Sequence, residues 1–112
     1  MHKTRVIPVL LLGARGLEKG VGFRDRVYVG CPRNAARVFN AHRVDELVLV
    51  SQDDAEDMAR RLAREEGIFG GISAAGACWV AQQIAAQEQN ATIVFVVCDR
   101  GDRYLSTGVF PA

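Results

Sequence analysis

Apolar residues along this chain follow two different patterns. Near-continuous apolar runs occur at Thr4–Leu12, Glu46–Val50 and Ala91–Cys98, and such runs are typical of parallel strands covered on both faces. The first run contains Pro8, which a strand tolerates only where the missing N–H is not needed. Between residues 52 and 66 the apolar positions recur every third or fourth residue, which predicts an amphipathic helix. Alternation of the two patterns favours an α/β fold.

Helix boundaries are marked by residues with known capping preferences. Pro32 suits the first turn of a helix that runs to about His42. Ser51, with an acidic residue three places on, is a capping-box-like start for the next helix, and Gly67 suits its C-terminal cap. A third helix is expected from about Ala75 to Gln87.

The remaining segments complete an alternating order. A short strand is expected at Ile68–Ser73, and Asp99–Ala112 forms a tail. The glycine-punctuated stretch from Gly13 to Gly30 indicates a long loop or a loose hairpin, with β-like pieces at Leu17–Phe23 and Arg26–Val29. The predicted order is β-(loop or hairpin)-α-β-α-β-α-β in one domain of 112 residues. We therefore expect a mostly parallel four-stranded sheet with helices on its faces, a three-layer flavodoxin- or Rossmann-like arrangement.

The charge pattern argues against two classes of partner. The formal net charge is +1, with 14 basic residues scattered among 13 acidic ones, whereas nucleic acids and anionic membranes demand clustered Lys and Arg. The longest apolar run, Val6–Leu12, is too short to span a bilayer. His2, Lys3 and Arg5 precede it as in a signal peptide, but no small-residue cleavage site follows. We expect a cytoplasmic protein that binds neither nucleic acid nor membrane.

The cysteines indicate no metal site. Cys31, Cys78 and Cys98 form no C-x-x-C pair and no ligand cluster with His2 or His42. Cys31 lies just before a predicted helix, where the terminal N–H groups favour the thiolate. No base lies near it in sequence, so a structural thiol is the expected state.

Two polar segments are candidates for binding or catalysis. Asp99, Arg100 and Asp102 could form an active-site rim at the C-terminal end of a strand, or a solvated turn. Two carboxylates without a defined pocket do not make an acid–base pair, so no enzyme is expected. The turn around Ser73 joins a strand to a helix N-terminus, where free N–H groups can hold an anion. Its candidate anion-binding residues are Gly71, Ser73, Ala74 and Gly76.

Three segments of the first half, Arg5–Leu12, Gly16–Phe23 and Val44–Val50, are similar in order and spacing to the cyclase subunit of imidazole glycerol phosphate synthase. They also resemble related barrel proteins of surface-polysaccharide biosynthesis. The resemblance implies the first strand–helix–strand unit of a (βα)₈ barrel. The residue that matches that family's first catalytic aspartate is Leu11, which cannot transfer a proton, and Lys19 matches a lysine of the mobile first loop. The later barrel units, with the second catalytic aspartate and the phosphate loops, have no counterpart.

Two segments of the second half, Leu62–Ser73 and Cys98–Phe110, resemble the C-terminal end of cysteine synthases, the pyridoxal-phosphate β-replacement enzymes. In that family the serine that matches Ser73 hydrogen-bonds the pyridine nitrogen of the cofactor. The family continues with serine and glycine, where this chain has Ala74 and Ala75. The Schiff-base lysine and the glycine-rich phosphate loop have no counterpart, and covalent cofactor chemistry needs both.

These resemblances predict a chimera. Residues 1–50 would be a barrel-derived βαβ segment, and residues 50–112 a segment with αβαβ order from a pyridoxal-phosphate enzyme, followed by the tail. Because neither part brings the reactive groups of its family, we expect an artificial, recombined domain with no evolved activity, no cofactor and no metal. The alternative is weak binding of phosphate or a pyridoxal-phosphate-like molecule near Ser73.

Self-association is expected on the same grounds. A sheet taken from larger sheets keeps edges and apolar patches that once faced neighbours. Pairing between copies, or exchange of the first strand or the tail, would cover them. We therefore expect a homodimer or a higher oligomer, with or without exchanged segments.

Overall fold

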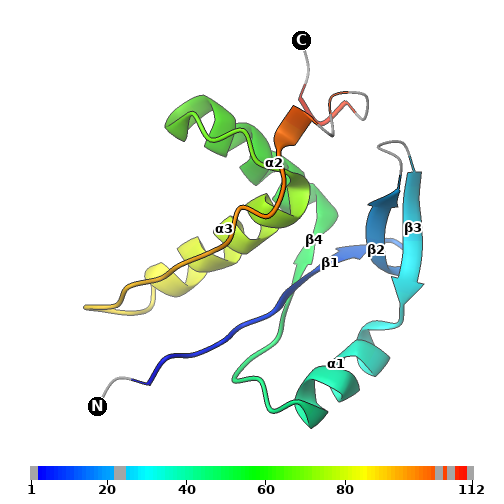
Figure 1. The fold of residues 1–112 in the computed structure, drawn as a ribbon, viewed down its shortest axis with the longest axis vertical. Helices are drawn as coiled ribbons and strands as arrows, with labels where there is room; N and C mark the ends of the chain where they lie inside the picture. The colour runs from blue at the N-terminus through cyan, green and yellow to red at the C-terminus, as the bar shows by residue number, and fades with distance from the viewer. Residues whose placement is uncertain (1–2, 22–24, 103–104, 106–107, 111–112) are drawn as a thin grey trace.

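The structure is a mixed α/β fold in which two packed helices cover a small sheet (Figure 1). The computed structural model describes residues 3–21, 25–102, 105 and 108–110. Its elements in chain order are β1 (Val9–Gly13), β2 (Gly16–Val21), β3 (Asp25–Gly30), α1 (Pro32–Ala41), β4 (Val48–Ser51), α2 (Gln52–Arg61), the π-helical turn η1 (Leu62–Glu66) and α3 (Ile72–Ala85). None of the helices that the structure describes is long and apolar enough to cross a membrane.

The sheet has the strand order β3-β2-β1-β4. β1 and β4 pair in parallel, from Val9 opposite Val48 to Leu12 opposite Ser51. β2 lies antiparallel beside β1, because a connection of two residues reverses the chain and is too short for a parallel neighbour. β3 lies antiparallel beside β2. Pro8 lies just before β1 and contributes only its carbonyl oxygen, which accepts from the Val48 N–H at 3.0 Å. The loose-hairpin interpretation is therefore confirmed for residues 13–21 and 25–30, while the end of the expected piece Leu17–Phe23 lies outside the described residues.

The expected mostly parallel sheet is corrected by these pairings. Among the described residues, β1 and β4 form the one parallel pair. Ile68–Ser73 contributes only an isolated bridge between Gly70 and Arg100, since α3 already begins at Ile72. Ala91–Cys98 runs as extended chain and makes no backbone hydrogen bond to the rest of the described chain. A ladder needs a hydrogen-bonded neighbour, and none of the strands that the structure describes pairs with residues 91–98.

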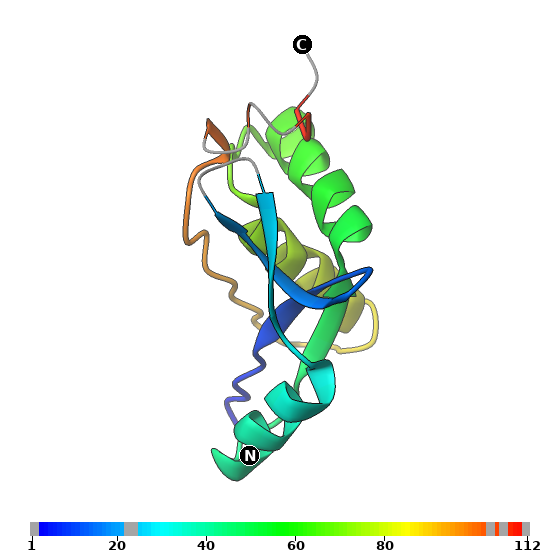
Figure 2. The same cartoon turned by 90° about the vertical axis from the view of Figure 1, so that its right-hand side faces the viewer.

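Helix α1 does not cover the second face of the sheet. It begins at Pro32 as predicted, with Cys31 as N-cap, but none of its residues is buried. It follows directly from β3, the outermost strand, and therefore lies beyond the end of the sheet (Figures 1 and 2). The expected three-layer arrangement is thus replaced by two layers, the sheet and the α2–α3 pair.

Helix α2 begins where Ser51 predicts, and its π-helical continuation η1 ends where Gly67 predicts. The Ser51 Oγ accepts from the Asp54 N–H at 3.1 Å, as in a capping box. The helix continues into η1 and stops at Gly67, whose φ of 68° is left-handed. The Ile68 N–H then donates to the Leu62 carbonyl oxygen at 3.1 Å, which satisfies a carbonyl at the helix end.

The core lies between α2, α3 and the C-terminal residues. Its buried members are Ala55, Met58, Ala59, Leu62, Ile72, Ala75, Cys78 and Val109. Gly76 allows α3 to approach the sheet closely: a Cβ there would lie 3.0 Å from Leu11 Cδ2 and 3.1 Å from Val50 Cγ1. Because Leu11 belongs to β1, this contact joins the first part of the chain to the second.

Candidate functional site

The predicted anion-binding residues surround the first turn of α3. Gly71 is the N-cap of the helix. Ser73 is exposed, and its Oγ lies 3.2 Å from Cys98 Sγ. Ala74 is fully buried, and Gly76 packs against the sheet. Two of the four residues therefore serve the packing of α3 and not an open site.

The side chain of Asp99 lies against this turn. The Gly71 N–H donates to the Asp99 carbonyl oxygen at 3.2 Å, and a Cβ at position 71 would collide with the Asp99 carboxylate. The carboxylate is thus held beside the N-terminus of α3, the end of the helix dipole that favours negative charge. An added anion would have to displace a carboxylate that the chain itself supplies.

The predicted polar rim continues from Asp99 into a turn. The Gly101 N–H donates to the Phe69 carbonyl oxygen at 2.8 Å. Arg100 donates to Asp102 Oδ2 at 3.0 Å, and the two side chains are 82% and 43% exposed. An ion pair this exposed adds little stability. The geometry fits the solvated-turn interpretation better than an active-site rim.

Cys31 lies apart from these residues, at the start of α1. The backbone N–H groups of Asn34 and then of Arg33 lower the pKa of its thiol, and the charges of Arg33 and Arg37 act in the same direction. Burial instead raises the pKa of the Cys78 thiol. Over residues 3–21, 25–102, 105 and 108–110, no group of three His, Cys, Asp or Glu side chains could hold a metal ion. The candidate catalytic residues thus fall in two separate places.

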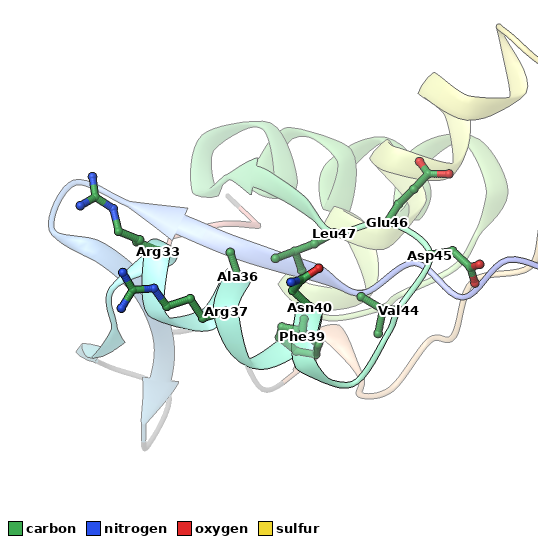
Figure 3. A pocket seen from close by; sticks show the side chains of 9 residues that line it. All are labelled: Arg33, Ala36, Arg37, Phe39, Asn40, Val44, Asp45, Glu46 and Leu47. Carbon is green, nitrogen blue, oxygen red and sulfur yellow. The ribbon is translucent and has the colours of Figure 1, made fainter.

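A hollow between α1 and the segment that leads into β4 was not predicted from the sequence (Figure 3). It measures about 480 Å³, and its lining residues are Arg33, Ala36, Arg37, Phe39, Asn40, Val44, Asp45, Glu46 and Leu47. The two arginines lie at one end and the two acids at the other (Figure 3). The signal in the sequence was the set of apolar residues Ala35, Ala36, Val38 and Phe39 on α1, a helix of which no residue is buried.

The acidic end of the hollow is engaged by the N-terminal segment. Asp45 accepts from the Val6 N–H at 2.8 Å and from Lys3 Nζ at 3.0 Å. These two hydrogen bonds lower the pKa of the Asp45 carboxyl. Glu46 accepts from Arg5 at 2.6 Å. The acids therefore fasten residues 3–6 to the approach of β4 and serve the fold.

Two groups of known proteins match parts of the chain, although no family model does. Over 74 residues, 66% of this chain, it is 51% identical to cysteine synthase B of Pseudomonas aeruginosa and covers 25% of that protein. Over 80 residues, 71% of this chain, it is 45% identical to the imidazole glycerol phosphate synthase subunit-like protein hisF2 of the same species and covers 30% of it. The chain thus spans a quarter to a third of these relatives. It combines a hisF-like segment with one similar to the C-terminal part of cysteine synthase.

The two matches overlap in the middle of the chain. A stretch of 74 residues within 112 always includes residues 39–74, and a stretch of 80 always includes residues 33–80. Residues 39–74, which contain β4 and α2, therefore lie in both matches.

A solved structure resembles nearly the whole arrangement. The crystal structure of O-ureido-L-serine synthase matches with a TM-score of 0.68 at 33% identity, over 95% of this chain and 34% of that one. A match of this extent includes the hisF-like strands as well as the helices that follow them. The chain therefore follows a path over most of its length that the chain of another protein also takes.

The cysteine synthase resemblance implies pyridoxal phosphate, but the residues present do not fit it. A covalently held cofactor needs a lysine, and the chain has two. Lys3 pairs with Asp45 beside the N-terminal segment. Lys19 lies on β2, and its side chain is outside the described residues. Residues 50–112 keep the exposed hydroxyl of Ser73, which matches a cofactor contact of cysteine synthases, but they contain no lysine.

Proposed function

We propose that this chain is a recombined α/β domain that folds but has no catalytic activity of its own. The observation that carries the proposal is the environment of Leu11, the residue that matches the catalytic aspartate of the barrel family. Its Cδ2 would lie 3.0 Å from a Cβ at Gly76, so the strand end that carries chemistry in that family is packed against α3. Leu11 is half-buried against the core, so a charged group there would lose part of its hydration among apolar side chains.

The scattered candidates support the same proposal. Cys31 lies at the start of α1, while Asp99 and Ser73 lie at the start of α3. Nucleophilic or acid–base catalysis requires such groups within hydrogen-bond reach of one another. Because the chain covers only 25% of cysteine synthase B, activities of the whole relatives come to it only as hypotheses.

Activity and folding have to be measured together. The purified chain would be assayed with pyridoxal phosphate, O-acetylserine and sulfide, and separately with the cyclase substrate, while urea unfolding is followed by circular dichroism. We expect no turnover above background and a cooperative unfolding transition. Leu11→Asp restores the matching carboxylate and is expected to lower stability without creating turnover. Enzyme-like turnover, or the spectrum of an unpacked chain, would overturn the proposal.

Self-association is the second part of the proposal. Large apolar side chains remain exposed, among them Val6 at 62% and Val94 at 82%. Burying apolar surface between copies is favourable at about 25 cal/mol per Å². We therefore propose a homodimer or higher oligomer, and a light-scattering mass of a monomer at high micromolar concentration would contradict it.

Weak anion binding at the first turn of α3 is the alternative function. The exposed Ser73 hydroxyl favours it, and the Asp99 carboxylate opposes it. Anion binding would be tested by amide NMR titration with phosphate and with pyridoxal phosphate, on the unmodified chain and on Asp99→Asn. If neither shows saturable shifts near Ser73, anion binding is removed as a function.

A further inference from the structure

The hollow between α1 and the segment that leads into β4 has the size of a small-molecule site. Its volume of about 480 Å³ lies within the range of roughly 300–1,000 Å³ of pockets that hold small organic ligands. Its lining runs along α1 from Arg33 to Asn40, a distance of about 10 Å at roughly 1.5 Å per residue. The half-buried side chains of Phe39, Val44 and Leu47 form its apolar wall. A compact molecule with an apolar body fits this space, whereas a long lipid chain does not.

The acidic end of the hollow needs no cation from a ligand. Asp45 pairs with Lys3 at 3.0 Å, and Glu46 pairs with Arg5 at 2.6 Å. Each of these two carboxylates is therefore balanced by a cation of the chain itself. A positively charged group on a ligand would have to compete with Lys3 or Arg5.

The basic end carries two arginines without a counter-charge. Arg33 and Arg37 lie one turn apart on α1, at the same end of the hollow (Figure 3). In the part of the chain that the structure describes, neither guanidinium takes part in an ion pair or a hydrogen bond. Both charges help to lower the pKa of the Cys31 thiol, so the potential at this end is positive. Guanidinium groups bind carboxylates through paired N–H donors, which makes this end suited to an organic anion.

We infer that the hollow binds a small aromatic carboxylate, whose charged group lies at Arg33 and Arg37 and whose ring lies against the apolar wall. Phe39 offers an aromatic contact to the ring, and a two-ring acid matches the length of about 10 Å. A free amino acid fits less well, because its ammonium group would meet acids that are already paired. The site lies apart from the first turn of α3 and requires no catalysis, so it goes beyond the proposed function.

The site is tested by amide NMR titration of the full chain with naphthylacetate and with naphthylacetamide, the uncharged counterpart with the same ring. We expect saturable shifts at residues 33–47 with a dissociation constant of about 1 mM for the acid. Binding of the amide should be about tenfold weaker, because it lacks the charge that the arginines recognise. Acetate, which has the charge without the ring, should not saturate at the same concentrations. The site is overturned if naphthylacetate gives no saturable shifts at residues 33–47, or if the amide binds equally well.

Two double variants with the same change of net charge separate the two arginines from charge in general. Arg33→Gln with Arg37→Gln removes both cations of the basic end and should raise the dissociation constant of naphthylacetate about tenfold. Arg61→Gln with Arg64→Gln removes two exposed cations at the end of α2 and in η1. This control should leave the constant within about twofold at physiological salt, because distant charges are screened. Equal losses in the two variants would contradict recognition by Arg33 and Arg37.

The class of acid is tested with octanoate, a linear carboxylate. Octanoate has the charge and an apolar body but no ring to contact Phe39, so it should bind more weakly than naphthylacetate. Equal or tighter binding of octanoate would overturn the assignment to aromatic acids. Turnover by the chain would refute the proposed lack of activity and leave this site standing, while a failure of naphthylacetate to bind would leave that proposal unchanged.

Discussion

Replacing Gly76 by valine tests whether the two parts of the chain share one core. A Cβ at this position would lie 3.0 Å from Leu11 Cδ2, 3.1 Å from Val50 Cγ1 and 3.5 Å from Ala55 Cβ. Leu11 lies on β1, and Gly76 lies on α3, 65 residues later in the chain. Valine adds two more methyl groups at this close approach, so α3 and the sheet must move apart.

Two opposing effects set the magnitude. Valine is a better helix former than glycine by about 0.3–0.5 kcal/mol. Overpacking a well-packed site costs about 1–3 kcal/mol. We therefore expect Gly76→Val to lower the free energy of unfolding by about 1–2.5 kcal/mol. This is a large share of the total for a domain of this size, about 5–15 kcal/mol.

A double-mutant cycle separates the contact from the helix effect. Leu11→Ala removes the nearest neighbour, so the penalty of Gly76→Val should fall by about 1 kcal/mol in that background. Urea unfolding followed by circular dichroism gives all four free energies. Ala85→Val, at an exposed position of the same helix, is the control and should cost about 0.5 kcal/mol. The reasoning is refuted if Gly76→Val costs no more than this control, or if the cycle shows no coupling.

Three further predictions concern the cap, the acid response and the thiols. Ser51→Ala removes the acceptor of the first N–H bond of α2 and should lower the free energy of unfolding by about 1 kcal/mol in urea. Hydrogen bonds lower the pKa of Asp45 in the folded chain below its ordinary value of 3.8, so they stabilise the fold fully at pH values above 3.8. This stabilisation is lost as the pH falls through the lowered pKa of the folded chain. Asp45→Asn should therefore be less stable at neutral pH and lose less on acidification below about pH 4, measured by urea midpoints across pH. The lowered pKa of Cys31 and the raised pKa of buried Cys78 predict that iodoacetamide labels Cys31 before Cys78 in the folded chain, as read by peptide mass mapping.

Each of these predictions has a contrary outcome. Ser51→Thr keeps the cap and should stay near the natural stability, so equal losses for the alanine and threonine variants would contradict the capping argument. If the urea midpoints of the unmodified chain and of Asp45→Asn fell equally on acidification, the Asp45 carboxyl would not be the source of the acid sensitivity. Labelling of Cys78 as fast as Cys31 in the folded chain would mean that α3 is not packed as described.

The path of the chain was predictable wherever neighbouring residues decide it. Pro32, Ser51 and Gly67 set the start of α1 and both ends of the second helix, because capping is a contact between residues only a few positions apart. The resemblance of the two halves to different enzymes was equally visible, since it lies in the order of residues alone. So was the replacement of a reactive aspartate by Leu11.

Partners distant in sequence were decided only by the tertiary structure. The apolar segment, residues 91–98, has the composition of a buried strand, yet it becomes part of a sheet only if another strand lies beside it, and composition does not state which strand that is. The carboxylate of Asp99 against Gly71 and the hollow beside α1 likewise depend on how separate elements come together. A sequence fixes the local preference of each residue for helix, turn or strand. The neighbours across space follow from the joint packing of all elements, which no short stretch of sequence contains.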